Sequence, residues 1–157
     1  MQDSRYKKRP GTRLKKKDAR IKKPLSLFRS CVSGKKGGEM AFEDLDVWKR
    51  AKILSSKIYR STAKLRDFGF RDQITRSGLS IPSNIAEGFE RESIKDCINF
   101  LSYAKGSCGE LRTQVYIGLE IGNIQPEDAN MWIRETEEIS SMIKGLIKTK
   151  RNQLPSK

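Results

Sequence analysis

The chain has 157 residues, of which 33 are basic and 19 acidic, so its net charge is +14, and it contains no histidine. The lack of histidine removes the commonest general base and the commonest metal ligand, which disfavours a catalytic or metal-binding role. The apolar runs fall well short of the ~20 residues of a membrane span, and the N-terminus lacks the apolar core of a secretory signal.

Most of the positive charge belongs to the N-terminal segment. Residues 1–38 hold 14 basic and 2 acidic residues, a net charge of +12. Such a block of like charges with few apolar groups is typical of disorder, so residues 1–39 are predicted to be a disordered basic tail. Two interpretations stay open. The tail is a basic arm that orders on RNA, or it is upstream leader assigned by mistake, since the codons for Lys35 to Met40 permit a ribosome-binding site.

From Met40 onward, apolar residues recur at helical spacing. Four amphipathic helices are predicted, at residues 42–65, about 70–91, 93–120 and 126–151. Gly69 is expected as the C-cap of the first helix, Ser93 as the N-cap of the third and Pro126 as the first residue of the fourth.

Four helices of this length joined by short turns favour an up-down arrangement. The predicted fold is all-α: an antiparallel up-down four-helix bundle over residues 40–151, with the disordered tail before it and a disordered C-terminus at residues 152–157. The side chains expected to be buried are Trp48, Ile58, Ile85, Leu111, Ile139 and Ile143.

The stretch "SIPSNIAEGFER", residues 80–91, places a proline, an asparagine and a glycine within the second helix. Gly78 gives the backbone room to bend around Pro82, so a kinked continuous helix is expected rather than a break. Beside the core face runs a polar stripe, which together with Gly88 is the candidate oligomer interface: Arg76, Asn84, Glu87, Gly88 and Arg91. The alternative is a solvated flank with one weak Glu87–Arg91 ion pair.

These motifs resemble a known family. The segments "FEDLDVWKRA" at residues 42–51, "SIPSNIAEGF" at 80–89 and "FLSYAKGSCGELRTQV" at 100–115 are similar to the four-helix-bundle family of proteins encoded in intervening sequences of bacterial 23S rRNA genes. A more distant resemblance is to the accessory protein of diversity-generating retroelements, a basic pentameric barrel that binds nucleic acid and a reverse transcriptase. The resemblance implies a bundle that assembles into a ring, pentameric by that likeness, and it does not imply catalysis.

Enzymatic chemistry finds little support in the sequence. A di-iron bundle needs Glu-x-x-His pairs, and the chain has no histidine. Cys97 and Cys108 lie on the apolar stripe of the third helix and are expected to be core residues rather than nucleophiles. With Cys31 they make an odd count without metal-type spacing, which suits a reducing cytoplasm. We therefore expect no catalytic residue, no metal, no cofactor and no small-molecule substrate.

Nucleic-acid binding has two candidate carriers, the tail and the first helix. Lys49, Lys52 and Arg60 lie within about 40° of a common direction on a helix, and they are the candidate RNA- or DNA-binding residues of the bundle. The alternative is a solvated basic face. The sequence thus predicts a cytoplasmic, non-enzymatic, homo-oligomeric bundle associated with nucleic acid, with no membrane partner. The alternative function is a protein–protein adaptor that does not bind nucleic acid.

Overall fold

A computed structural model of the protein describes residues 41–155. The predictions for the tail at residues 1–39 and for Cys31 lie outside the described residues, as do residues 156–157. The described chain contains one short 3-10 helix and four long helices, and no strand. Their bounds are η1 Phe42–Asp44, α2 Asp46–Thr62, α3 Phe68–Phe89, α4 Ile94–Glu120 and α5 Pro126–Arg151.

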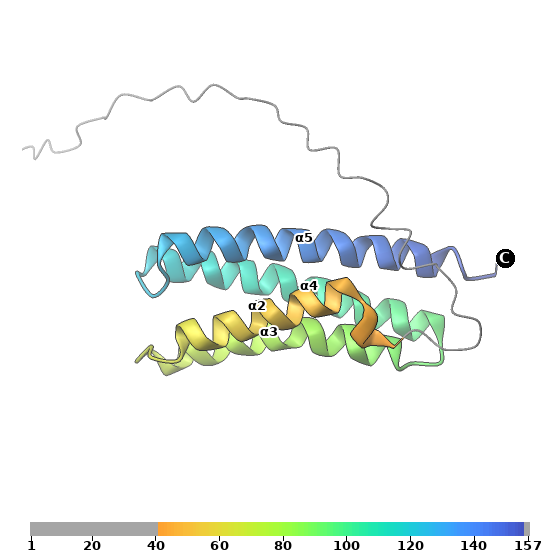
Figure 1. Ribbon diagram of the computed structural model, residues 1–157, viewed down its shortest axis with the longest axis horizontal. Coiled ribbons are helices and arrows are strands. Elements are labelled where there is room, and N and C mark those ends of the chain that lie inside the picture. The colour runs from red at the N-terminus through yellow and green to blue at the C-terminus, as the bar shows by residue number, and fades with distance from the viewer. Residues whose placement is uncertain (1–40, 156–157) are drawn as a thin grey trace, which may run out of the picture. The chain divides into compact units, whose positions relative to one another are not determined.

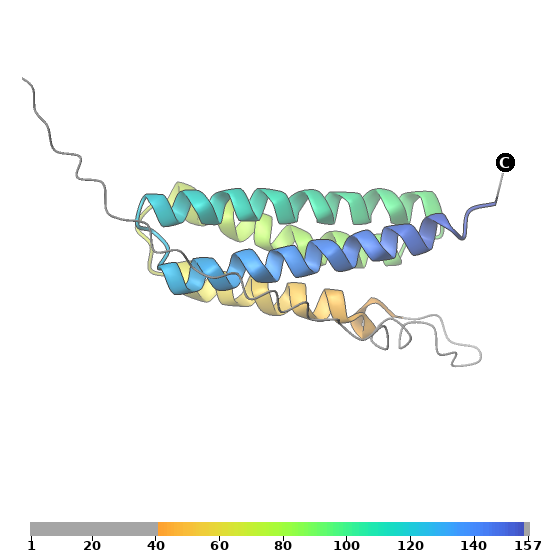
Figure 2. The same ribbon diagram turned by 90° about the horizontal axis from the view of Figure 1, so that it is seen from above.

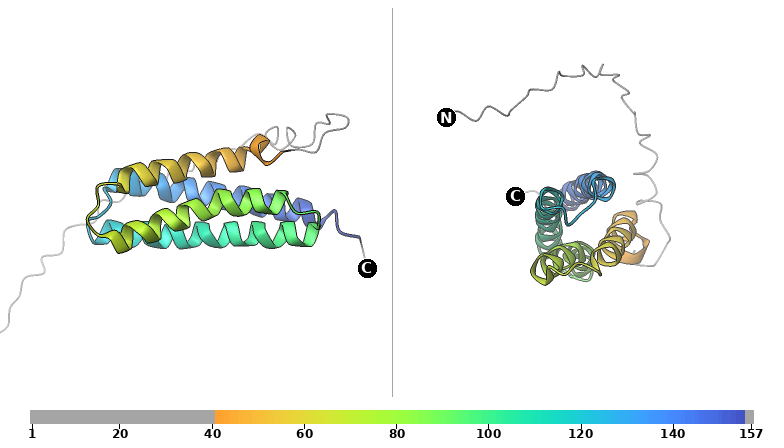
Figure 3. Two further views of the ribbon diagram at one scale, coloured as in Figure 1. Left: turned by 90° about the horizontal axis from the view of Figure 1, so that it is seen from below. Right: turned by 90° about the vertical axis from the view of Figure 1, so that its left-hand side faces the viewer.

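The four long helices form an antiparallel up-down bundle, as predicted. Successive helices run in opposite directions along the long axis (Figures 1 and 2). Each helix contacts its neighbours in chain order, and α5 closes the ring against α2. The view along the axis in Figure 3, right, shows this cyclic order. The α3–α4 contact is the most extensive and the α2–α5 contact the least, so the bundle is least tightly closed between its first and last helices.

Polar side chains and one proline fix most of the helix starts. The Ser93 side chain accepts a hydrogen bond from the backbone N–H of Asp96, and Pro126 opens α5, so both predictions are confirmed. The prediction for Gly69 is wrong. The Asp67 side chain accepts a hydrogen bond from the N–H of Phe70 and thereby caps α3, which places Gly69 inside that helix.

Gly122 makes the turn between α4 and α5. Its φ of 75° lies in the left-handed region, which glycine adopts without a steric penalty. The N–H groups of Asn123 and Ile124 then donate to the carbonyl oxygen of Gly118, at 2.8 and 3.0 Å. Ile124 packs directly over Gly118, where a Cβ would lie 2.5 Å from Ile124 Cδ1. A side chain at position 118 would therefore displace the side chains of Ile124 and Phe70, whose Cζ would lie 2.6 Å from its Cβ.

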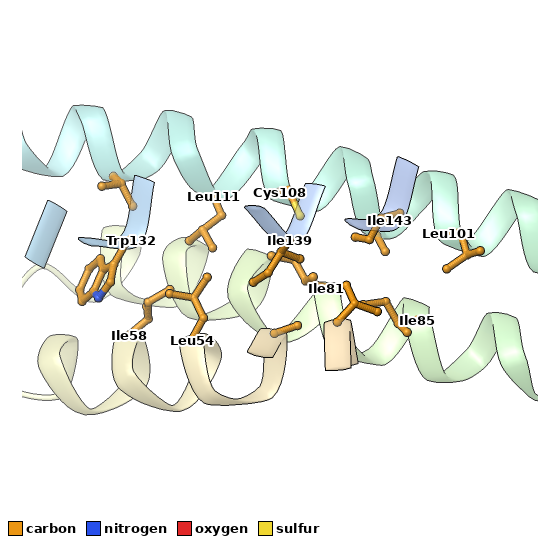
Figure 4. Packing of buried hydrophobic residues seen from close by; sticks show 14 of the residues in the cluster. Leu54, Ile58, Ile81, Ile85, Leu101, Cys108, Leu111, Trp132, Ile139 and Ile143 are labelled. Atoms are coloured by element: carbon orange, nitrogen blue, oxygen red, sulfur yellow. The ribbon is translucent and has the colours of Figure 1, made fainter. Parts of the chain in front are cut away.

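The core fills the space between the four helices (Figure 4). Five of the six side chains predicted to be buried are fully enclosed, namely Ile58, Ile85, Leu111, Ile139 and Ile143. Trp48 is the exception. It is only partly buried, and its ring packs edge-to-face on Phe42 at 5.1 Å between centroids. Val47 and Leu54 join Ala51, Ile58 and Thr62 in the core from α2, so the buried face is the one that the pattern predicts, with Trp48 at its edge.

Pro82 lies inside α3 without interrupting it, as the sequence predicted. A proline ring cannot donate to the carbonyl four residues earlier, here that of Gly78. Two polar side chains next to Pro82 bond back to the helix: Ser83 Oγ donates to the Leu79 carbonyl at 2.9 Å, and Asn84 Nδ2 donates to the Ser80 carbonyl at 2.8 Å. α3 therefore continues through Pro82 as one helix.

The described part of the C-terminus, residues 152–155, follows directly after α5. Leu154 is half-buried against the core, and its N–H donates to the carbonyl of Arg151 at 3.1 Å. An apolar side chain within reach of the bundle end is stabilised by burial, whatever the polarity of its neighbours.

Candidate nucleic-acid and assembly surfaces

The first candidate surface is the basic face of α2. The segment from Val47 to Arg66 contains seven basic residues and no acidic one. Its basic residues are Lys49, Arg50, Lys52, Lys57, Arg60, Lys64 and Arg66. All but Arg50 are exposed, including the three that the sequence singled out, Lys49, Lys52 and Arg60. From Val47 to Arg66, the exposed charged side chains of α2 and of the turn that follows it are therefore all basic.

The three predicted nucleic-acid residues differ in their surroundings. Lys49 Nζ donates to the carbonyl oxygen of Asp44 at 3.1 Å and lies 3.9 Å from Asp46 Oδ1. Lys52 Nζ lies 4.6 Å from the centroid of the Trp48 ring, a cation–π contact. Among residues 41–155, no carboxylate pairs with Arg60. Of these three residues, Lys52 and Arg60 are thus the most available to an external anion.

Arg50 is the residue of the basic segment that forms an ion pair with another helix of the bundle. Its Nε and Nη2 donate to the two carboxylate oxygens of Glu135 on α5, at 2.6 and 2.8 Å. This bidentate bond raises the pKa of Arg50 and lowers the pKa of Glu135, so both groups stay charged and neutralise each other at neutral pH. The pair joins α2 to α5 at their sparse contact. The sequence held no signal for it, because the partners are 85 residues apart.

A groove lies in the seam between α2 and α5. Its volume is about 130 Å³. Ile53, Leu54 and Lys57 line it from α2, Met131 and Trp132 line it from α5, and the Arg50–Glu135 pair also borders it. Trp132 is 1% exposed, and its indole Nε1 has no hydrogen-bond partner in the described part of the chain.

The second candidate surface, called here the α3–α4 face, combines the polar stripe of α3 with aromatic residues of α4. Glu87 and Arg91 form the predicted ion pair. The Arg91 guanidinium also lies 4.8 Å from the centroid of the Phe100 ring, which packs edge-to-face on Tyr103 at 5.8 Å. These contacts connect the two helices at their outer surface. The aromatic half of this face was not predicted, although "FLSYAKG" shows it in the sequence.

The remaining predicted interface residues lie in different places. Arg76 is exposed and pairs with Asp72 at 2.9 Å, and Asn84 is half-buried. Gly88 corrects the prediction. It is buried inside the bundle, where a Cβ would lie 3.1 Å from Phe100 Cβ and 3.2 Å from the carbonyl oxygen of Cys97. Its lack of a side chain serves the close approach of α3 to α4 within one chain, so it is not available to a second copy.

Comparison with known proteins places the chain in a family. The model of the family described as "23S rRNA-intervening sequence protein" matches residues 43–145, which is more than half of the chain. The chain belongs to this family. A search of curated proteins gives no match.

The family assignment agrees with a solved structure. A crystal structure of a protein of unknown function from the S23 ribosomal protein family of Bacteroides thetaiotaomicron VPI-5482 superposes with a TM-score of 0.61 at 25% sequence identity. The match covers 65% of this chain and 98% of that one. The solved protein therefore matches this 23S rRNA-intervening sequence family member over almost its whole length.

The side chains that could act in catalysis or metal binding are either dispersed over the bundle or buried within it. Cys97 and Cys108 are buried, as predicted, and burial raises the pKa of the Cys108 thiol to about 12. A thiol held in this state is a poor nucleophile at neutral pH. Among residues 41–155, no three or more His, Cys, Asp or Glu side chains are grouped to hold a metal ion. None of the described helices is both long and apolar enough to cross a membrane.

Proposed function

We propose that this family member is a non-enzymatic, homo-oligomeric bundle that binds single-stranded nucleic acid on the basic face of α2. The observation that carries the proposal is the run of seven basic residues without an acidic one, with Lys52 and Arg60 exposed and free of carboxylate partners in the described chain. A surface of this kind attracts phosphates because each contact releases condensed counterions.

Assembly would raise the affinity of the basic face of α2 for nucleic acid. A single bundle offers only a few phosphate contacts, and their affinity falls steeply with salt. When copies are joined, contacts after the first are intramolecular and the affinities add through avidity. The resemblance to pentameric barrel proteins supports such an assembly.

The α3–α4 face is the proposed surface of assembly. Tyr103 is 61% exposed, and Ile117 on the same helix and Ile121, the residue at its C-terminal cap, are 47% and 54% exposed. On an α-helix these three residues point within about 40° of one another. Exposed apolar side chains aligned in this way favour contact with another protein surface. The ordered Glu87–Arg91–Phe100 cluster lies on the same face and supplies polar contacts at its edge.

The same exposed residues support the alternative, a protein–protein adaptor that does not bind nucleic acid. In that case the α3–α4 face would hold a different protein and the cations of α2 would be a solvated surface. Binding of RNA distinguishes the two functions.

The test of nucleic-acid binding uses residues 40–157, which exclude the basic tail, and an unstructured RNA. Each Lys or Arg that contacts a phosphate of a single strand contributes about 0.7 to the slope of log K against log salt. Replacement of Lys49, Lys52 and Arg60 by Gln should therefore flatten the slope by about 2 units. The matched control replaces Lys95, Lys105 and Lys144, which are exposed on α4 and α5. In this variant the slope of log K against log salt should keep most of its parent value. Equal slopes for the two triple variants, or no binding by the parent, would favour the adaptor.

The test of assembly is light scattering on residues 40–157, which should give several times the monomer mass. Tyr103→Glu places a charge in the proposed interface and should lower the mass to that of a monomer. Tyr59→Glu is the matched control, because Tyr59 on α2 is 62% exposed and Tyr103 is 61% exposed. A monomeric parent protein, or dissociation by Tyr59→Glu instead, would contradict the assignment of this face.

A further inference from the structure

The α2–α5 groove is large enough for one ring. Its volume is about 130 Å³, comparable to the engineered cavity of about 150 Å³ in another protein that holds benzene. Ile53, Leu54 and Met131 give it apolar walls. It opens beside the basic face of α2, since Lys57 lines it directly.

Trp132 gives the groove an unused hydrogen-bond donor. Its Nε1 is buried and has no acceptor among residues 41–155, and a buried N–H without an acceptor is destabilising. Figure 4 draws the indole nitrogen on the edge of the ring that is turned toward α2. An occupant that carries an acceptor oxygen would relieve this cost.

The groove has a movable wall. Nε1 is covered in the free chain, so an occupant reaches it only when a neighbouring side chain moves. Met131 and Lys57 are suited to this, because both are long, exposed and flexible, and Lys57 Nζ touches Met131 Sδ at 3.9 Å. Rotation of these two side chains changes no backbone contact.

The charges around the groove favour a neutral occupant with a phosphate on one side. Glu135 borders the groove, and Glu127 and Glu138 lie next to it along α5. The Arg50–Glu135 pair is neutral overall, and the apolar walls of the groove disfavour an unpaired charge inside it. Lys57 and the exposed cations of α2 attract an anion on the opposite side. A neutral ring joined to a phosphate satisfies both conditions.

We propose that this groove binds one unstacked base of single-stranded nucleic acid. A ring carbonyl oxygen of the base accepts from Trp132 Nε1, the ring lies against Ile53 and Met131, and the adjoining phosphate faces Lys57 and Arg60. Unstacked bases bound in pockets beside cationic surfaces are a general mode of single-strand recognition. This inference rests on the proposed function, because it gives one base of the bound strand a defined position.

The experiment measures the affinity of the full chain for an oligouridylate and for an abasic strand of the same length. The two strands carry the same phosphates, so the basic tail attracts them equally and the ratio of their affinities reports the bases. We expect the oligouridylate to bind more tightly by about threefold to tenfold, the value of one hydrogen bond. It should also shift the Trp132 indole N–H signal in a ¹H–¹⁵N NMR spectrum, and the abasic strand should not. A Trp48→Phe variant assigns the two indole signals.

Three variants separate the groove from a general effect on folding. Trp132→Phe removes the donor and should abolish most of the preference for the oligouridylate. Ile53→Phe fills the groove from an exposed position that does not support the core, and it should do the same. Trp48→Phe should leave the preference unchanged. Equal binding of both strands, or an unmoved Trp132 signal, would overturn the base pocket while phosphate binding stands. Failure of both strands to bind would overturn the proposed function with it.

Discussion

Leu111→Ala is expected to lower the free energy of unfolding by about 2–5 kcal/mol, the usual range for a buried leucine. Leu111 is 0% exposed and points into the interior from the middle of α4, near Trp132 and Ile139 (Figure 4). All four helices contribute to this part of the core, so the space left by the side chain cannot be filled by a shift of one helix. Urea denaturation followed by circular dichroism measures the change, at one fixed protomer concentration because assembly would add to the apparent stability.

The matched control for this variant is Ile117→Ala on the same helix. Ile117 is 47% exposed, so its truncation should change the stability by less than about 0.5 kcal/mol. A loss below that value for Leu111→Ala would show that the buried face of α4 is assigned incorrectly. A large loss for Ile117→Ala in a protein that forms an oligomer would instead indicate that assembly buries this side chain.

The order and extent of the helices were accessible from the sequence because their signals are local. The 3.6-residue period, the Ser93 cap and Pro126 act within a few residues of each helix. The charge of α2 was also visible, since it depends only on which residues are present. The position of a helix start could still be misjudged by a competing local signal, as at Gly69, where the capping side chain of Asp67 decided the boundary.

The partial exposure of Trp48 could not be predicted in this way. Trp48 and Val47 are adjacent and both apolar, so the pattern allows either to face the core. The choice depends on the neighbouring elements: η1 provides Phe42 as a partner for the Trp48 ring, and Val47 is left to pack inside.

The groove and the Arg50–Glu135 pair depend on α2 meeting α5, at the far end of the chain. Arg50 looked like one cation among seven, and only its bidentate bond to Glu135 removes it from the set available to phosphates. The unpartnered N–H of Trp132 is likewise a property of the packed structure. A residue's type shows what it can donate, but its partners in the fold decide whether that donor is already used.

Gly88→Leu is expected to destabilise the bundle itself by about 1–3 kcal/mol or more, as overpacking of a tight interior does. The first carbon of the new side chain would lie 3.2 Å from the backbone oxygen of Cys97 and 3.1 Å from Phe100 Cβ, and three further carbons would follow. Neither contact can be relieved by rotating the end of a side chain, so α3 and α4 would have to separate at this position. The midpoint of thermal unfolding, measured by circular dichroism, should fall.

Gly109→Leu is the matched control, because it makes the same chemical change on α4 at a position where a Cβ would meet no atom within 4 Å. Leucine favours a helix over glycine by nearly 1 kcal/mol, so this variant should be as stable as the parent or more so. The pair also separates folding from assembly. If Gly88 lay in an oligomer interface, Gly88→Leu would dissociate the oligomer and leave each protomer's unfolding unchanged at low concentration. Loss of protomer stability at every concentration is the result that the buried position of Gly88 requires.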